Sequence, residues 1–214
     1  MDLLRVVEIL REKRSIFHSE ADFQFALAWE IQETYPLADV RLEYPPENEP
    51  NRYIDILVRY NGYVYPIELK YPTKKRSAVI GGELFNLKDH GAQDLGKYDF
   101  VKDLCRIESF ARHLKSFRHG YVLWLTNDPS YWTPPRSEIA GYAAFSVHNG
   151  ARKSGVLAWG SNLGIGTIKG REAELLLKAE YEIQWRDYSE LDGRAGVFKY
   201  VLLQVKSDGS IENP

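Results

Sequence analysis

Cysteine is almost absent from the chain, and so are long apolar runs. Cys105 is the only cysteine among 214 residues, which excludes an internal disulfide and a zinc site built on cysteines. No stretch approaches the about 18 consecutive apolar residues that suggest a membrane span. Residues 1–17 carry charges throughout, including Arg5, Glu8 and Arg11, so they do not form a signal peptide. The cytoplasm is therefore the expected compartment, with no membrane partner.

A large excess of one charge is missing as well. The formal net charge of −2 gives no global sign of nucleic-acid binding, so any such binding must use a local basic patch. Hydrophobic residues make up 44% and charged residues 27%, as in ordinary soluble globular proteins. The length suits one large domain. We expect a single domain over 1–214, with a core at about 17–126 and an elaboration at about 127–214.

The most informative segment of the sequence is 52–70, where Asn61-Gly62 lies between two β-rich runs. Asn-Gly is the strongest short-range signal for a two-residue hairpin turn. Such a turn pairs residues whose numbers sum to 123, which places Asp55 opposite Glu68. Lys70 lies two residues further on and shares that face. The opposite face carries Ile54, Ile56, Val58, Ile67 and Leu69 and is expected to be core.

Two opposed carboxylates destabilise a sheet unless a cation lies between them. Hard cations such as Mg²⁺ prefer carboxylate oxygens, so Asp55 and Glu68 are candidate ligands for Mg²⁺ or Mn²⁺. The alternative is an exposed cluster of ion pairs formed by Asp55, Glu68 and Lys70, since surface pairs of this kind are common and weak.

The elements around the hairpin are predicted from periodicity and breakers. An amphipathic helix is expected over 2–14, and a second helix from an N-cap at Ser19 to about Tyr35. A strand over 40–44 precedes the hairpin, and a helix over about 97–117 precedes a buried strand over 121–125. Residues 73–90 are expected to be irregular. The order is α-β-β-β-α-β.

Beyond residue 126 the pattern is weaker. Strands are expected over 143–147 and 155–159, a helix over 171–180, and an alternating strand over 181–185. The run over 197–205 predicts a strong terminal strand. These elements would form a β-rich elaboration of the core.

The pattern D-x12-E-x-K on paired strands resembles the PD-(D/E)XK nuclease superfamily over roughly residues 17–126. The resemblance implies an α/β, restriction-endonuclease-like fold, with a mixed sheet flanked by helices in the order α-β-β-β-α-β. It also implies that Asp55 and Glu68 bind the metal and that Lys70 orients or activates water. The proline that often precedes the aspartate is replaced here by Ile54.

Many members of this superfamily add an acidic residue from the helix before the first strand. Glu20 and Glu30 both qualify, and Glu20 lies beside the buried stripe of its helix. Glu20 is therefore a candidate catalytic residue and metal ligand. Its alternative role is a favourable charge at a helix N-terminus.

The resemblance implies a metal-dependent nuclease that hydrolyses phosphodiester bonds, with DNA as the expected partner. Metal ions generate the nucleophile and stabilise charge in such reactions, and a nearby lysine can balance the growing negative charge. The alternative is an inactive nuclease fold that binds nucleic acid or protein. A homodimer is one arrangement that would let such an enzyme cut both strands.

Several residues downstream are candidate nucleic-acid contacts. Lys74, Lys75 and Arg76 follow Lys70 closely and would lie near the scissile phosphate; their alternative is a solvated charge run. Gln93 precedes the long helix, where some related nucleases carry Gln and Tyr four residues apart, although here Tyr98 is five away.

Two other features of the sequence, a glycine-rich segment and the single cysteine, have alternative interpretations. Gly164, Gly166 and Gly170 could form a phosphate-binding loop of an unrelated α/β enzyme, but their spacing differs from the dinucleotide fingerprint. Cys105 has no histidine placed nearby by local pattern, so a packing role is expected rather than a nucleophilic one.

Overall fold

A computed structural model describes residues 1–46, 53–135, 141–161, 163–164, 166 and 168–207. Three α-helices lie in these ranges: α1 (Leu3–Lys13), α2 (Glu20–Thr34) and α3 (Gln93–His113). The backbone N–H of Asp22 donates to Ser19 Oγ at 3.2 Å, which confirms Ser19 as the N-cap of α2. None of the described helices is both long and apolar enough to cross a membrane.

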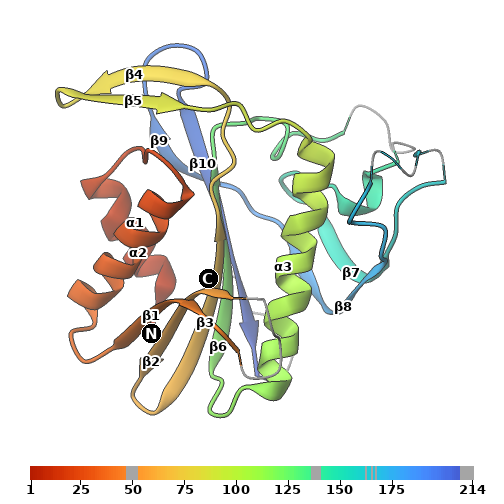
Figure 1. Cartoon of the computed structure of the whole chain (residues 1–214), viewed down its shortest axis with the longest axis horizontal. Helices are drawn as coiled ribbons and strands as arrows, with labels where there is room; N and C mark the ends of the chain where they lie inside the picture. Colours follow the sequence, from red (N-terminus) through yellow and green to blue (C-terminus); the bar gives the residue numbers. More distant parts are fainter. Residues whose placement is uncertain (47–52, 136–140, 162, 165, 167, 208–214) are drawn as a thin grey trace.

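A mixed six-stranded sheet forms the centre of the protein (Figure 1). Its strands, in the order in which they lie side by side, are β1 (Asp39–Tyr44), β2 (Ile54–Tyr60), β3 (Tyr63–Lys70), β6 (His119–Thr126), β10 (Val197–Lys206) and β9 (Arg186–Glu190). Strands β3 and β6 run parallel, and the other neighbours run antiparallel. The α/β class and the mixed sheet are confirmed.

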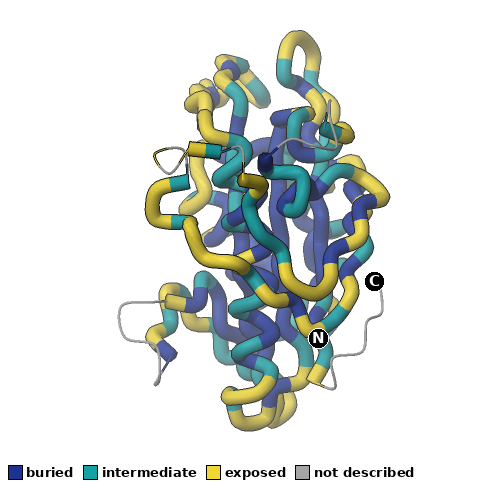
Figure 2. Tube along the Cα trace, turned by 90° about the vertical axis from the view of Figure 1, so that its right-hand side faces the viewer, coloured by how far each residue is buried: buried dark blue, intermediate teal, exposed yellow. Residues whose placement is uncertain are grey.

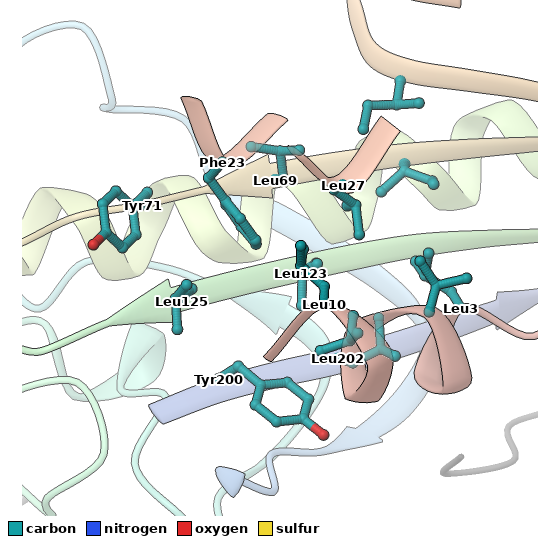
Figure 3. Close-up of a cluster of buried hydrophobic side chains, with 14 of the residues drawn as sticks. Leu3, Leu10, Phe23, Leu27, Leu69, Tyr71, Leu123, Leu125, Tyr200 and Leu202 are labelled. Atoms are coloured by element: carbon teal, nitrogen blue, oxygen red, sulfur yellow. The ribbon is translucent and has the colours of Figure 1, made fainter. Parts of the chain in front are cut away.

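Helices cover both faces of this sheet, with α1 and α2 on one face and α3 on the other (Figure 1). Figure 3 shows the first core, where α1 and α2 meet the central strands. Its labelled side chains are Leu3, Leu10, Phe23, Leu27, Leu69, Tyr71, Leu123, Leu125, Tyr200 and Leu202. Buried residues concentrate along the central strands, while exposed ones lie mainly at the turns (Figure 2).

The hairpin register is confirmed. Strands β2 and β3 pair from Tyr60↔Tyr63 to Ile56↔Ile67, and each pair sums to 123. Asn61 and Gly62 have φ of 52° and 78°, the left-handed values that a type I′ turn requires at both central positions.

The predicted face of one residue was wrong. Ile54 packs in the core beneath α3 together with Leu57, whereas Ile56 and Val58 pack on the other face of the sheet. The change coincides with a break in the β1–β2 pairing between Leu42↔Ile56 and Tyr44↔Ile54. Glu43 lies at this break with a left-handed φ of 48°.

Two small two-stranded ribbons complete the described fold. Residues 76–87 form one ribbon, β4 (Arg76–Ile80) and β5 (Glu83–Leu87), turned by Gly81-Gly82. The expectation of irregular structure over 73–90 was therefore wrong. The glycines that suggested a break instead supply the positive φ values of a hairpin turn.

The second ribbon pairs β7 (Arg152–Leu157) with β8 (Leu175–Glu182) on the outer side of α3 (Figure 1). Most of the expected helix over 171–180 is thus strand. The expected strand over 143–147 begins instead with a 3₁₀ turn, η1 (Ala143–Phe145). Glu108 of α3 fixes this ribbon, accepting hydrogen bonds from Lys178 N at 2.9 Å and Tyr181 Oη at 2.9 Å.

Strand β10 confirms the predicted terminal strand, but it does not belong to an outer elaboration. It pairs with β6 from Lys199↔Thr126 to Lys206↔His119 and carries β9 on its other edge. The central sheet therefore includes strands from both sides of residue 126.

Candidate active site

Strands β2 and β3 carry Asp55, Glu68 and Lys70. The β2–β3 pairing ends at Ile56↔Ile67, one position before Asp55 and Glu68, but the charges of Asp55 and Lys70 both act on Glu68. Asp55 Oδ2 accepts a hydrogen bond from the backbone N–H of Leu69 at 2.7 Å. Lys70 Nζ lies 3.8 Å from the same oxygen. The Asp55 carboxylate is thus held between the backbone of β3 and the ammonium group of Lys70.

Helix α2 adds the candidate acid that precedes the strands. Glu20 Oε1 lies 3.5 Å from Lys70 Nζ, and Glu20 Oε2 accepts a hydrogen bond from the backbone N–H of Tyr71 at 2.9 Å. Lys70 therefore bridges Glu20 and Asp55. Glu30, the other acid weighed on this helix, is buried and pairs with Lys13 at 2.8 Å, away from this group.

Gln24 supports the strand that carries Asp55. Its amide nitrogen donates to the backbone oxygen of Asp55 at 2.7 Å and to Glu43 Oε1 at 2.8 Å. This contact lies at the break in the β1–β2 pairing, so it satisfies backbone and side-chain groups that the ladder leaves open.

Helix α3 contributes two residues that the sequence reasoning missed, Asp103 and Arg106. Arg106 Nη1 donates to Glu68 Oε2 at 3.0 Å and lies 3.0 Å from Glu68 Oε1. The guanidinium also donates to the backbone oxygen of Tyr53. Asp103 is buried and lies near enough to Lys70, Asp55 and Glu68 for their charges to shift one another's pKa values. Its position four residues before Ile107 places it on the inward side of the helix, which was the available signal.

Burial dominates the electrostatics of this cluster. It raises the pKa of Glu68 well above its usual range, and the charges of Asp55 and Asp103 raise it further. Burial also raises the pKa of Asp55, and that of Asp103 to about 7, although Lys70 opposes both shifts. Burial alone would lower the pKa of Lys70, but Asp55, Asp103 and Glu20 outweigh it and raise that pKa. Lys70 is therefore a protonated ammonium group, and its positive charge does not fully offset the cost of burying the carboxylates around it.

The carboxylates of this cluster are potential ligands of a divalent cation. Within the described residues, no group of three or more His, Cys, Asp or Glu side chains is arranged to hold a metal ion. Two buried carboxylate oxygens, Glu68 Oε1 and Asp103 Oδ2, nevertheless have no hydrogen-bond partner. Glu68 Oε1 still lies 3.0 Å from Arg106 Nη1, so what it lacks is a hydrogen bond and not a positive neighbour. Carboxylate oxygens are the donors that Mg²⁺ and Mn²⁺ prefer. Asp55, Glu68 and Glu20 supply oxygen atoms of the kind that these ions prefer, but they are not gathered into one group, and Arg106 already pairs with Glu68.

Lys70 and Glu20 line an open cavity of about 630 Å³. Its walls come from the start of α2, the end of β3, the β4–β5 ribbon and the start of α3. Polar side chains in this wall include His18, Glu20, Lys70, Thr73, Asn86, Lys88, His90, Asp99 and Arg171. A ligand in the cavity would thus reach Lys70 directly.

The residues expected to contact nucleic acid differ in exposure and in ion pairing. Lys75 is exposed, and Lys74 lies 3.3 Å from Asp128 Oδ2 and 3.6 Å from Asp89 Oδ1. Gln93, the first residue of α3, donates to Asp128 Oδ2 at 3.1 Å. Lys75 is therefore the freest cation of the run.

Arg76 does not match its expected role as a phosphate contact. It is only 8% exposed, and its guanidinium donates to the backbone oxygens of Asp192 and Arg194, each at 2.8 Å. These bonds tie β4 to the turn between β9 and β10. Tyr98 is also buried, and it stacks on Trp159 with ring centroids 5.5 Å apart.

The surroundings of the glycine-rich segment and of Cys105 do not support a phosphate-binding loop or a nucleophilic cysteine. Residues 165 and 167 of the glycine-rich segment lie outside the described residues, and β8 rather than a helix follows it. Burial raises the pKa of the Cys105 thiol to about 11, and its Sγ contacts the backbone oxygen of Leu176 at 3.5 Å. A thiol with a raised pKa is a poor nucleophile at neutral pH.

Comparison with known proteins returned no match. Neither a model of a known protein family, nor a curated protein, nor a solved structure matches the chain.

Proposed function

We propose that this protein is a metal-dependent nuclease that hydrolyses phosphodiester bonds in nucleic acid, with DNA as its substrate and a restriction-endonuclease-like fold. One observation carries the proposal: Lys70 bridges Asp55 and Glu20 on adjoining elements, beside buried Glu68. With the β4–β5 ribbon between β3 and α3 set aside, the order α2-β1-β2-β3-α3-β6 supports it, because it matches the α-β-β-β-α-β order that the resemblance implies.

The residues take distinct roles in this proposal. Asp55, Glu68 and Glu20 hold Mg²⁺ or Mn²⁺, which when bound would activate water and polarise the phosphate. Lys70 stays protonated because the carboxylates around it raise its pKa. It therefore stabilises negative charge on the phosphate and orients the attacking water, rather than removing a proton.

A second candidate function rests on a different contact. Arg106 already pairs with Glu68 at 3.0 Å, so a guanidinium sits where a cation would compensate that carboxylate. A nuclease fold that has lost catalysis and retains nucleic-acid or protein binding would show the same pairing. Metal-dependent cleavage separates the two functions.

The first experiment combines cation binding and cleavage. Purified protein is titrated with Mn²⁺ by calorimetry and assayed on single-stranded, duplex and branched DNA and on RNA, with Mg²⁺, Mn²⁺ or Ca²⁺. Asp55→Ala and Glu68→Ala should each abolish Mn²⁺ binding and cleavage. Glu180→Ala, on the exposed surface of β8, serves as the control.

Each outcome decides between the candidates. Unchanged Mn²⁺ affinity in Asp55→Ala and Glu68→Ala would remove these residues from a metal site. Mn²⁺ binding without cleavage of any substrate would favour the non-catalytic module. Sedimentation of the protein with and without duplex DNA tests whether a homodimer forms.

A further inference from the structure

The β4–β5 ribbon has two faces of different character. Its inner face is anchored: Phe85 and Leu87 are buried, and Phe85 stacks on His18 with ring centroids 4.3 Å apart. His18 Nε2 also lies 2.8 Å from Glu83 Oε1. Together with the Arg76 contacts to the β9–β10 turn, these interactions fix the ribbon beside the start of α2.

The outer face of the ribbon is exposed along its whole length. It consists of Ser77, Val79, Leu84 and Asn86, and the same alternation extends it to the flanking Lys75 and Lys88. Val79 is 68% exposed and Leu84, its cross-strand partner, is 56% exposed. Both side chains of this apolar pair are thus open to contact by a ligand.

The outer face is ordered by chemistry from base to tip. Lys75 and Lys88 stand at the base, and within the described residues neither forms an ion pair. Ser77 and Asn86 face each other in the middle, where the Ser77 hydroxyl donates to Asn86 Oδ1. Cations, then hydrogen-bonding groups, then aliphatic groups follow one another along one surface.

This face continues into the candidate active site. Asn86 and Lys88 line the same cavity as Glu20 and Lys70. A polymer lying along the ribbon would therefore pass Glu20 and Lys70. This continuity favours nucleic acid over a separate protein partner.

We infer that the outer face of the β4–β5 ribbon enters the major groove of duplex DNA and places it across the site around Lys70. The inference rests on the proposed function and adds its substrate class. The major groove, about 12 Å wide, admits a two-stranded ribbon without deformation, whereas the minor groove, about 6 Å wide, would have to be widened. Lysines at the base suit phosphates, Ser77 and Asn86 suit base edges, and Val79 and Leu84 suit thymine methyl groups.

Binding is measured by fluorescence anisotropy of a labelled duplex in Ca²⁺ and in EDTA, apart from any cleavage. The double variant Lys75→Ala/Lys88→Ala should weaken binding and reduce the slope of log affinity against log salt by about 2. Val79→Ser/Leu84→Ser should weaken duplex binding by roughly tenfold. Lys115→Ala/Lys178→Ala, two exposed lysines away from the cavity, is the matched control.

The groove is identified by modifying the DNA. A duplex with glucosylated 5-hydroxymethylcytosine, whose sugars fill the major groove, should bind wild type roughly tenfold more weakly, and prior loading of the minor groove with netropsin should have little effect. The inference would be overturned if wild type bound the glucosylated duplex as tightly as an unmodified one. It would also be overturned if the ribbon variants bound duplex DNA like wild type. Preference for single strands would overturn it as well.

The failures of the two proposals are distinguishable. If the ribbon variants bind duplex normally while Asp55→Ala abolishes cleavage, the groove inference fails and the nuclease stands. If the ribbon variants lose duplex binding but wild type cleaves nothing, the nuclease fails and the groove contact stands.

Discussion

Arg106 of α3 and Glu68 of β3 form a buried ion pair, with Nη1 3.0 Å from the carboxylate and side chains 17% and 1% exposed. The pair joins the helix on one side of the sheet to the strand that carries the candidate metal ligand. In this structure Arg106 supplies the positive charge beside Glu68, and a divalent cation bound by Glu68 would have to share it with the arginine or replace the arginine.

Replacing Arg106 should reveal whether Glu68 can bind a metal ion. Arg106→Met leaves Glu68 buried without a positive partner, so the free energy of unfolding without metal should fall by about 3–5 kcal/mol. If Glu68 binds metal, Mn²⁺ should raise the melting temperature of Arg106→Met more than that of wild type, as measured by calorimetry. Arg152→Met breaks an exposed pair with Glu180 and should cost less than about 1 kcal/mol. An equal Mn²⁺ effect in Arg106→Met and wild type would argue against Glu68 as a ligand.

Lys70 should matter for cleavage far more than for binding. Lys70→Ala should retain Mn²⁺ and DNA binding but lose cleavage by roughly 10²–10⁴-fold, the scale of one positioned electrostatic or acid–base group. Lys70→Arg should rescue poorly, because the planar guanidinium differs in reach and shape from the ammonium. Single-turnover cleavage and anisotropy measure the two effects separately. A parallel loss of binding would instead make Lys70 a phosphate contact.

In the absence of a bound cation, the buried Asp103 carboxylate should lower the stability of the folded protein. Its Oδ2 is buried and has no hydrogen-bond partner, so Asp103→Asn should raise the melting temperature in EDTA. The same variant should reduce the stabilisation by Mn²⁺, because it removes negative charge near the site. Asp99→Asn, one turn away, breaks a pair with Arg171 at 2.6 Å and should lower the melting temperature slightly. A fall in stability for Asp103→Asn would mean that its charge is already compensated.

The pH dependence of folding should report the Asp22–Arg14 pair. Burial alone would raise the pKa of Asp22, but hydrogen bonds from Arg14 and the His18 backbone outweigh it and lower that pKa. The folded value lies below the unfolded one, so this stability is fully present above about pH 4 and is lost as pH falls through the folded pKa. Asp22→Asn should therefore cost about 1 kcal/mol at pH 7 and progressively less below pH 4. Urea unfolding across pH measures this, with exposed Asp187→Asn as control.

The sequence by itself determined the local geometry of the site. Asn61-Gly62 dictates a turn with two positive φ values, and the turn fixes the register of the two strands that carry Asp55 and Glu68. Ser19 caps α2 through a hydrogen bond within one turn. These features depend on residues close in sequence, so pattern and propensity predicted them.

Only the tertiary structure decided what depends on distant partners. Residues 175–182 favour a helix by composition, yet pairing with β7 and burial of Leu177 and Tyr181 against α3 make them a strand. Strand β10 joins the central sheet because β6 pairs with it across more than 70 residues of sequence. Asp103 and Arg106 reach the site only because α3 packs over β3, a contact that no local pattern encodes.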